Sequence, residues 1–224
     1  MRILVIDVGG THVKVCATGH KKRMEIPSGP KMTATKMVAG VRKNIAGWKY
    51  DVITIGYPGT VLHGHIVCEP HNLGPGWIKF NFKKAFGCPV KIINDAAMQA
   101  LGSYHGKRML FLGLGTGLGS ALIVDGMLEP MELAHLPYKK GRTYEDYVGL
   151  AGLKRLGKKK WRRHVNDVVR QLKTVLEADY VVLGGGNARL LKKLPPDSRV
   201  GDNANAFRGG LRVWSKSRSR HFRQ

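Results

Sequence analysis

Each half of this chain begins in the same way, with two short apolar strands joined by a glycine-rich turn. In the first half the strands are "RILVID" and "HVKVCAT", residues 2–7 and 12–18, with "VGGT" between them. In the second half the segment "MLFLGLGTGLGSALIVDG", residues 109–126, has the same plan. Apolar runs of this length predict β-strands, and helices and further strands follow in both halves. We therefore expect an α/β protein of two domains, 1–106 and 107–214, followed by a basic tail, 215–224.

The intervening segments predict the remaining elements. Met37, Val41, Ile45 and Trp48 recur at helical spacing, which predicts an amphipathic helix in "TATKMVAGVRKNIAGW". Four other segments are assigned from their periodicity and turn residues. They are a strand in "KRMEI", a strand in "DVITIGYPG", a strand followed by a helix in "CPVKIINDAAMQAL", and a helix in "WRRHVNDVVRQLKTVLEA". The segment "YVVLGGGNARLLKKL" is predicted as strand, glycine turn and helix.

Charge is the unusual part of the composition. Thirty-eight Lys and Arg against 15 Asp and Glu give a formal net charge of +23 over 224 residues. Such a field favours polyanions, which include nucleic acid, acidic membrane and phosphate polymers. Cys16, Cys68 and Cys88 are odd in number and far apart, so neither a disulfide framework nor a zinc site is expected. The sequence shows no signal peptide and no apolar run long enough to span a membrane, which favours a cytoplasmic protein.

Three glycine turns are candidate phosphate sites, because glycine lets backbone N–H groups approach an anion closely. The first is Asp7-Val-Gly-Gly-Thr11, where Asp7 could hold a hydrated Mg²⁺ beside the phosphate. The second is Gly115-Thr116-Gly117, which lacks the ending of a Walker loop and precedes a strand. The third is Gly184-Gly185-Gly186, at the start of a predicted helix. Their structural alternatives are a plain hairpin, a softened strand bend and close helix–strand packing.

Asp95 supplies the candidate catalytic carboxylate. It follows a predicted strand and opens a predicted helix in "IINDAAMQAL", so its simple interpretation is an N-cap. The functional interpretation makes it a base that accepts a proton from a substrate hydroxyl. A helix N-terminus favours the ionised form, so we expect its position to matter more than a raised pKa.

The order of these motifs resembles that of the sugar-kinase, actin and heat-shock ATPase superfamily. More narrowly, the chain resembles the ROK family of bacterial sugar kinases and, within it, the polyphosphate glucokinases. The resemblance covers most of residues 2–214. The matching segments are "IDVGGTHVKV", "GYPGTV", "NLGPGW", "VKIINDAAMQALG", "LGLGTGLGSALIVDG", "ELAHL" and "VVLGGGN". It implies two ribonuclease-H-like domains with mixed sheets flanked by helices and an active site in the cleft between them.

The resemblance also implies a role for each matching position. Asp95 would be the catalytic base, and Asp7 would lie near Mg²⁺, in contact through water. The first phosphate loop would be Asp7, Gly9, Gly10, Thr11 and Lys14, and the second would be Gly115, Thr116 and Gly117. The sugar would be bound by Asn94, Asp95, Glu132 and His135, and a nucleotide or distal phosphate by Gly184, Gly185 and Gly186.

Two departures from the family pattern concern the sugar side. Ala134 stands where the family's Glu-x-Gly-His motif has glycine, and its methyl group could tighten or re-aim the sugar pocket. Many members carry a cysteine-rich zinc motif after the histidine, whereas "LPYKKGRTYEDY" follows here, so no zinc is expected. Glu145 is one possibility for a further sugar-binding carboxylate.

The basic segment "LKRLGKKKWRRH", residues 153–164, bears on the phosphoryl donor. It is either a solvated helix entrance or a track for polyphosphate, whose charges would add affinity through counterion release. The sequence therefore favours a hexose kinase that uses polyphosphate, ATP or both to phosphorylate the 6-hydroxyl of glucose or a similar hexose. Two alternatives remain open: an ATP-only kinase for mannose or an amino sugar, and a non-catalytic regulator that binds sugar or polyanions. A homodimer and non-specific nucleic-acid binding are also expected.

Overall fold

The computed structural model describes residues 1–202 and 204–215 and divides them into two compact units. The first unit combines Met1–Met98 with Ala206–Ser215, and the second comprises Gln99–Asn205. The division therefore lies close to the expected boundary after residue 106. It differs for the last segment, which was expected in the second domain but packs in the first. The expected basic tail, 215–224, lies outside the described residues apart from Ser215.

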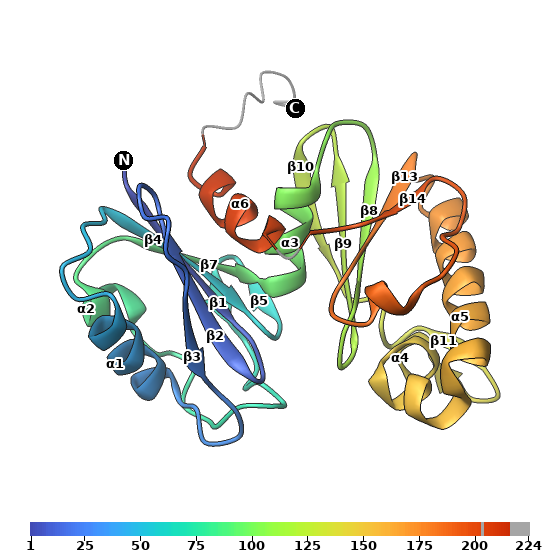
Figure 1. Cartoon of the computed structure of the whole chain (residues 1–224), viewed down its shortest axis with the longest axis horizontal. Helices are drawn as coiled ribbons and strands as arrows, with labels where there is room; N and C mark the ends of the chain where they lie inside the picture. Colours follow the sequence, from blue (N-terminus) through green and yellow to red (C-terminus); the bar gives the residue numbers. More distant parts are fainter. Residues whose placement is uncertain (203, 216–224) are drawn as a thin grey trace. The chain divides into compact units, whose positions relative to one another are not determined.

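The first unit is built on a five-stranded mixed sheet with the order β3-β2-β1-β4-β7 (Figure 1). Its strands are β1 (Ile3–Val8), β2 (His12–Ala17), β3 (Met24–Pro27), β4 (Val52–Tyr57) and β7 (Val90–Asn94). β1, β2 and β3 are antiparallel neighbours, whereas β1, β4 and β7 run parallel. A small hairpin, β5 (Val61–Leu62) and β6 (His65–Ile66), follows β4. The parallel strands place their carboxyl ends, and with them Asp7 and Asp95, at one edge of the sheet.

Helices cover both faces of this sheet. α1 (Ala34–Asn44) places Met37, Val38 and Val41 in the apolar core over one face, as its periodicity predicts. A short helix, α2 (Phe82–Phe86), adds its two phenylalanines to the same core. On the other face, α3 (Asp95–Ser103) and α6 (Asn205–Arg212) contribute Met98 and Phe207 to a second cluster.

The end of the chain is fixed to the first sheet by hydrogen bonds as well as by apolar packing. The buried hydroxyl group of Thr54 donates to the carbonyl oxygen of Gly210 at 2.7 Å and accepts from Nε1 of Trp214 at 3.0 Å. The ammonium group of Lys91 lies 4.5 Å from the Trp214 ring centre and donates to Val213. Residues 206–215 are thus an integral part of the unit that carries Asp7 and Asp95.

The second unit repeats the sheet of the first, with the order β10-β9-β8-β13-β14. Its strands are β8 (Met109–Leu114), β9 (Leu118–Val124), β10 (Met127–Met131), β13 (Tyr180–Gly184) and β14 (Ser198–Val200). β8, β9 and β10 are antiparallel, and β8, β13 and β14 run parallel, which matches the first unit strand for strand. The expected duplication and the fold of two mixed sheets flanked by helices are confirmed.

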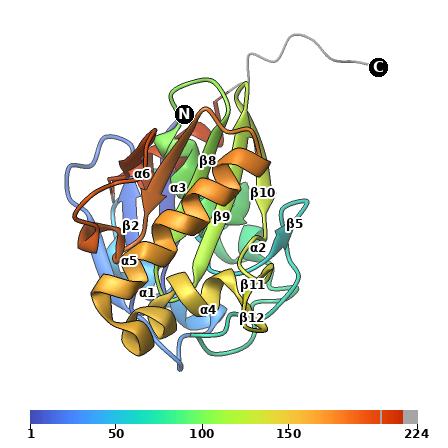
Figure 2. The ribbon, with the colours of Figure 1, turned by 90° about the vertical axis from the view of Figure 1, so that its right-hand side faces the viewer.

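Helix α5 (Leu150–Val175) covers one face of the second sheet (Figure 2). Its buried residues Trp161, Val165, Val168 and Leu172 pack with strand residues of the same core, as their helical spacing predicts. Val175, which continues the same spacing, is 77% exposed at the end of the helix and does not belong to this core. The helix begins well before the predicted range, and Gly157, with φ of +72°, breaks it near the basic segment. Before it stand a hairpin, β11 (Pro137–Lys139) and β12 (Arg142–Thr143), and helix α4 (Tyr144–Val148).

The prediction of a helix after the third glycine turn is wrong. The chain forms one 3₁₀ turn, η1 (Ala188–Leu190), and continues as an irregular segment to β14. Pro195 disfavours helical geometry at the residue before it and removes a donor, so the segment cannot continue as an α-helix into β14. In the part of the chain described, no helix is long and apolar enough to cross a membrane.

Candidate active site

The first glycine turn, Gly9–Thr11, joins β1 to β2, and two of its carbonyl groups accept hydrogen bonds from Ser28. The hydroxyl group of Ser28 donates to the carbonyl oxygen of Gly9 at 2.6 Å, and the Ser28 amide donates to that of Thr11 at 2.9 Å. A Cβ atom on Gly9 would lie 2.9 Å from the carbonyl oxygen of His12, so this closure requires glycine. The Gly9 amide itself donates to the carbonyl oxygen of His12 at 3.0 Å, so it is not available to an anion as expected. Because the carbonyls of Gly9 and Thr11 are engaged, the turn can still meet an anion with the N–H groups of Gly10 and Thr11 and the exposed Thr11 hydroxyl.

Asp7 lies beside this turn, between Lys14 on β2 and Gly56 on β4. Burial raises the pKa of its carboxyl group to about 6, and the positive charge of Lys14 limits the rise. A Cβ atom on Gly56 would contact the end of the Met98 side chain and lie 3.5 Å from Oδ1 of Asp7. Gly56 therefore provides the space around this carboxylate, a role that its place in "GYPGTV" did not reveal.

Asp95 follows the last residue of β7 and is the first residue of α3. Burial, and then the negative charge of Asp7, raises the pKa of Asp95 to about 7, against the lowering effect of amide hydrogen bonds. The expectation that the helix N-terminus would keep this group at an ordinary pKa is wrong, because burial and a neighbouring carboxylate outweigh the helix amides. Asp7 and Asp95 thus form an interacting pair within the first unit.

The N-cap of α3 is Asn94 and not Asp95. Oδ1 of Asn94 accepts from the amides of Ala96 and Ala97 at 2.9 and 3.1 Å, and its Nδ2 donates to Gly59 at 3.1 Å. Asp95 makes one local bond, from the Ala96 amide to its Oδ1 at 2.8 Å. Asn94 therefore fixes the start of the helix, and Asp95 is not required to cap it.

The second glycine turn, Gly115–Gly117, repeats the arrangement of the first. Nδ2 of Asn187 donates to the carbonyl oxygen of Gly115 at 2.9 Å, and the amide of Leu150 donates to that of Thr116 at 3.0 Å. The Gly115 amide is shared between the carbonyl oxygens of Gly113 and Gly117, both at 3.2 Å, so it is not available to an anion as expected. The carbonyl oxygens of Gly115 and Thr116 are engaged in hydrogen bonds, and this arrangement still favours binding of an anion by the turn.

The third glycine turn supports the second. Gly185 has φ of +79°, and a Cβ atom there would contact the backbone of Leu114, the last residue of β8. The amide of Asn187 donates to the carbonyl oxygen of Leu114 at 3.0 Å while its side chain reaches Gly115. Gly186 is exposed and open. Close packing, one of the two interpretations of this motif, therefore applies to Gly185.

Glu145 packs directly against the second turn. Its Oε2 accepts from the amide of Leu118 at 3.0 Å, and a Cβ atom on Gly117 would collide with the same carboxylate oxygen. Its own amide donates to the carbonyl oxygen of Ala134 at 3.0 Å, next to the predicted sugar residues. Sequence reasoning named Glu145 only as a possibility and missed Ser28 and Asn187. Each of these three acts on a turn at least 17 residues away along the chain.

Glu132 and His135 are side by side at the surface of the second unit. Nε2 of His135 lies 3.9 Å from Oε1 of Glu132, and the two side chains are 71% and 63% exposed, so both are open to a ligand. The methyl group of Ala134 is buried in the apolar core with Leu133. It points into the core, and not among the exposed polar groups that it was expected to re-aim.

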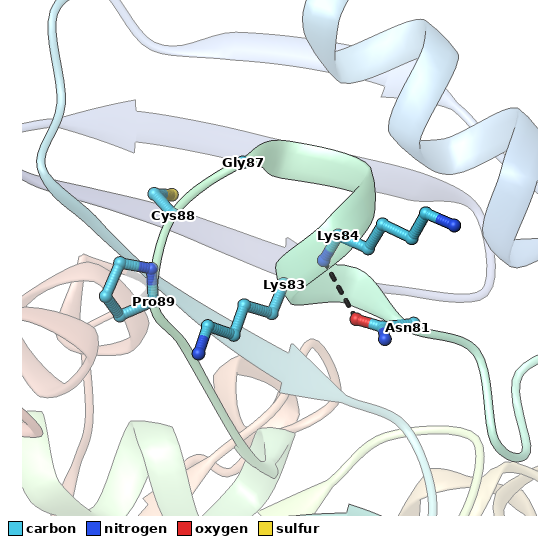
Figure 3. Close-up of a pocket in the computed structure, with 6 residues that line it drawn as sticks. All are labelled: Asn81, Lys83, Lys84, Gly87, Cys88 and Pro89. Carbon is cyan, nitrogen blue, oxygen red and sulfur yellow. Dashed lines mark hydrogen bonds between the residues drawn. The ribbon is translucent and has the colours of Figure 1, made fainter.

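A separate pocket of about 400 Å³ lies at the opposite end of β7 from Asp95 (Figure 3). It is lined by Asn81, Lys83, Lys84, Gly87, Cys88 and Pro89. Asn81 caps α2 by accepting from the Lys84 amide at 2.8 Å, shown as the dashed line in Figure 3. The residues predicted for the active site do not line this pocket.

Comparison with known proteins identifies relatives of this chain. The family model described as "ROK family" matches residues 3–129. A polyphosphate glucokinase of Mycobacterium tuberculosis (strain CDC 1551 / Oshkosh) is 30% identical over 217 residues, covering 85% of this chain and 80% of the relative. An N-acetylmannosamine kinase of Salmonella paratyphi B is 26% identical over 144 residues, covering 57% of this chain and 49% of the relative.

Among solved structures, an inorganic polyphosphate/ATP-glucomannokinase from Arthrobacter sp. strain KM superposes with a TM-score of 0.78. It is 22% identical and covers 93% of this chain and 96% of its own. At this identity the likeness shows the fold.

Proposed function

The chain belongs to the ROK family of sugar kinases, and from that premise we propose that it is a hexose kinase with polyphosphate as its donor. ATP is a second donor, and the acceptor is the 6-hydroxyl of glucose or a similar hexose. Support for these finer points comes from the named activities of the Mycobacterium and Arthrobacter proteins and from the residues described above.

The observation that carries the proposal is the state of Asp95. A general base is most effective when its pKa lies near the working pH, and the pKa of Asp95 is raised to about 7. Its Oδ1 is held by the Ala96 amide, which orients the carboxylate at the start of α3. We assign it the role of accepting the proton of the sugar hydroxyl as that oxygen attacks the terminal phosphorus. The bond from this phosphorus to the bridging oxygen of the donor breaks, and the leaving group is polyphosphate shortened by one unit, or ADP. Phosphoryl transfer needs positioning and charge neutralisation, which the glycine turns are suited to provide.

The first unit has a donor set that fits Mg²⁺. Mg²⁺ is usually held by one or two carboxylates, several waters and substrate phosphates. Asp7 presents a carboxylate beside the first glycine turn, and no group of three or more metal-binding side chains occurs among the described residues. Asp7 would hold the ion, which when bound neutralises phosphate charge and lowers the pKa of nearby carboxyl groups. Asp7 and Asp95 would then both be ionised at neutral pH.

Charge on the second unit supports polyphosphate as the donor. Residues 147–166 contain no Asp or Glu, and Nε of Arg162 ties this part of α5 to the carbonyl oxygen of Leu190 in η1 at 2.7 Å. Both segments carry exposed cations, which we call the basic track. They are Lys158, Lys159, Lys160, Arg189, Lys192 and Lys193. The second part of this track directly follows the third glycine turn, where a distal phosphate would lie.

The proposal is tested by measuring hexose 6-phosphate formation with polyphosphate and with ATP. The acceptors are glucose, mannose, N-acetylglucosamine and N-acetylmannosamine. We expect glucose to be phosphorylated with either donor, and the KM for polyphosphate to rise steeply with salt. No product from any pair would overturn the proposal. An N-acetylmannosamine preference is the second candidate, because the Salmonella relative carries that name.

A charge variant tests the basic track separately. Changing Lys158, Lys159 and Lys160 to Gln should raise the KM for polyphosphate and lower its logarithmic salt slope by about 0.7 for each phosphate that is no longer neutralised. The KM for ATP, which carries few charges, should change much less. Lys21, Lys22 and Lys49 are equally exposed in the first unit, so their triple Gln variant is the matched control. Equal effects of the two triple variants would contradict the basic track.

A further inference from the structure

An aromatic cluster fixes the β11–β12 hairpin to helix α5 within the second unit. The hydroxyl group of Tyr138 on β11 lies 3.1 Å from Nδ1 of His164 and 3.4 Å from Oδ2 of Asp167, both on α5. The ring of Tyr147 on α4 packs edge-on against Tyr138, with centroids 5.0 Å apart, and against His164 at 4.6 Å. Three elements therefore meet around the Tyr138 side chain, and none of the roles assigned so far uses this cluster.

The hairpin continues directly into α4, and the start of α4 holds the segment that carries Glu132 and His135. The amides of Tyr144 and Glu145, the first residues of α4, donate to the carbonyl oxygens of Leu136 and Ala134 at 3.1 and 3.0 Å. These two bonds lie on either side of His135 along the chain. At the other end of the segment, the Ser120 hydroxyl donates to Met131 at 2.8 Å and accepts from the Leu133 amide at 3.1 Å. The sheet thus fixes one end, and the start of α4 fixes the end nearer His135.

Charges around His164 favour its neutral form. Burial, and then the positive charges of Lys139 and Arg155, lowers its pKa, and the carboxylate of Asp167 opposes them. Lys139 lies 3.4 Å from Asp167 and 4.7 Å from the centre of the Tyr138 ring. The Tyr138 hydroxyl donates to Oδ2 of Asp167, so its oxygen can accept a hydrogen bond from Nδ1 of His164 in the neutral Nδ1–H tautomer as well as in the protonated ring. The link between hairpin and helix is therefore a short chain of hydrogen bonds from His164 through Tyr138 to Asp167.

We propose that the hydrogen bond between Tyr138 and His164 positions Glu132 and His135 for the acceptor sugar. Tyr138 and His164 are positioning residues, since they act through the hairpin and do not touch the sugar. The inference rests on the proposed function for the identity of the sugar, but the anchoring of the segment can be measured without substrate.

The test compares Tyr138→Phe with Tyr180→Phe in the full chain. The control residue is on β13 of the same unit and its hydroxyl accepts from the amide of His105 at 3.1 Å, and neither residue belongs to the hairpin, α4 or α5. Loss of the hydroxyl that contacts His164 and Asp167 predicts an approximately fivefold rise in the KM for hexose in Tyr138→Phe. Its kcat and its KM for polyphosphate should stay within about twofold of wild type, and the control should change none of the three. An unchanged hexose KM, or an equal rise in both KM values, would overturn the inference.

Hydrogen exchange provides the measurement that does not need a substrate. In Tyr138→Phe the amides of Tyr144 and Glu145 should exchange faster than in wild type, and in Tyr180→Phe they should not. If exchange is faster but the protein phosphorylates no hexose, the proposed function and the sugar assignment are contradicted, whereas the role of the Tyr138–His164 hydrogen bond in fixing this segment is supported. If exchange and the hexose KM are both unchanged in an active enzyme, the role of the Tyr138–His164 hydrogen bond is contradicted and the proposed function is not.

A second pair of variants tests the His164 side of the hydrogen bond. His164→Asn keeps a polar group that can pair with the Tyr138 hydroxyl close to the position of Nδ1. Its KM for hexose should be within about twofold of wild type, whereas His164→Leu, which keeps no such group, should raise that KM as Tyr138→Phe does. An unchanged hexose KM in His164→Leu would contradict the role of His164.

Discussion

Replacing Asp95 with asparagine should stabilise the ligand-free protein while it abolishes activity. The pKa of this carboxyl group is raised from 3.8 to about 7 in the folded chain. Between those values the folded state holds a proton that the unfolded state has lost, so stability falls as the pH rises. At 1.36 kcal/mol per pKa unit, the ionised group destabilises the folded state by up to about 4 kcal/mol above pH 7. Asparagine carries no charge and can still accept the Ala96 amide bond.

The assay is urea unfolding of wild type and Asp95→Asn, with a chelator present so that no divalent cation neutralises the pair. The advantage of the variant should be small near pH 4, grow up to about pH 7 and then stay constant. Hexose phosphorylation should fall by more than about a hundredfold, as expected for loss of a general base. The reasoning would be refuted by a variant less stable than wild type near pH 8, or by an advantage that does not depend on pH.

Asp51 provides a control in which the pKa shift has the opposite sign. Arg2 holds the pKa of Asp51 down at about 2 through a hydrogen bond and ion pair at 2.7 Å. Its ionised form favours the folded state above pH 3.8, and that contribution is lost as the pH falls toward 2. Asp51→Asn should therefore be no more stable than wild type at neutral pH. A gain in stability for both variants would point to a general effect of removing negative charge.

Three further substitutions test the packing around the site. Gly185→Ala should destabilise by about 2 kcal/mol or more in thermal unfolding, because φ is positive and backbone blocks the methyl group, whereas Gly186→Ala should change little. Gly117→Ala should displace the flexible Glu145 carboxylate, so kcat/KM should fall by about tenfold or more with only a small change in melting temperature. Thr54→Val leaves two buried partners without a hydrogen bond and should cost about 2 kcal/mol in urea unfolding.

The parts of the fold that depend on local pattern follow from the sequence. The two hairpins, the strand–helix passage at Asp95 and the apolar face of α5 all show periodicities that a single segment contains. The duplicated sheet order then follows from the repeated layout. Asp7 and Asp95 are the site residues that the sequence indicated best. Both lie at the carboxyl ends of strands, and these ends meet at the same edge of the parallel part of the sheet.

The errors have equally physical causes. Asn94 and Asp95 are adjacent and both can cap a helix, so only the backbone geometry at the start of α3 decides between them. The pKa of Asp95 is raised first by burial and then by Asp7, 88 positions earlier in the chain. Ser28 and Tyr138 act through partners 19 and 26 residues away. Such long-range partners leave no periodic signal in the sequence.

The return of residues 206–215 to the first sheet has a consequence for biosynthesis. The unit that holds Asp7 and Asp95 cannot complete its packing until residues 206–215 have left the ribosome, and these are made after residues 99–205 of the second unit. Until then the part of the buried face of β1 and β4 that α6 covers, with Val5 and the Thr54 hydroxyl, stays exposed. Residues 99–205 of the second unit, by contrast, can pack before α6 is complete. Premature termination after residue 205 should therefore leave the glycine turns of the second unit folded, but it should disturb the packing around Asp7 and Asp95, although these two residues are synthesised earlier.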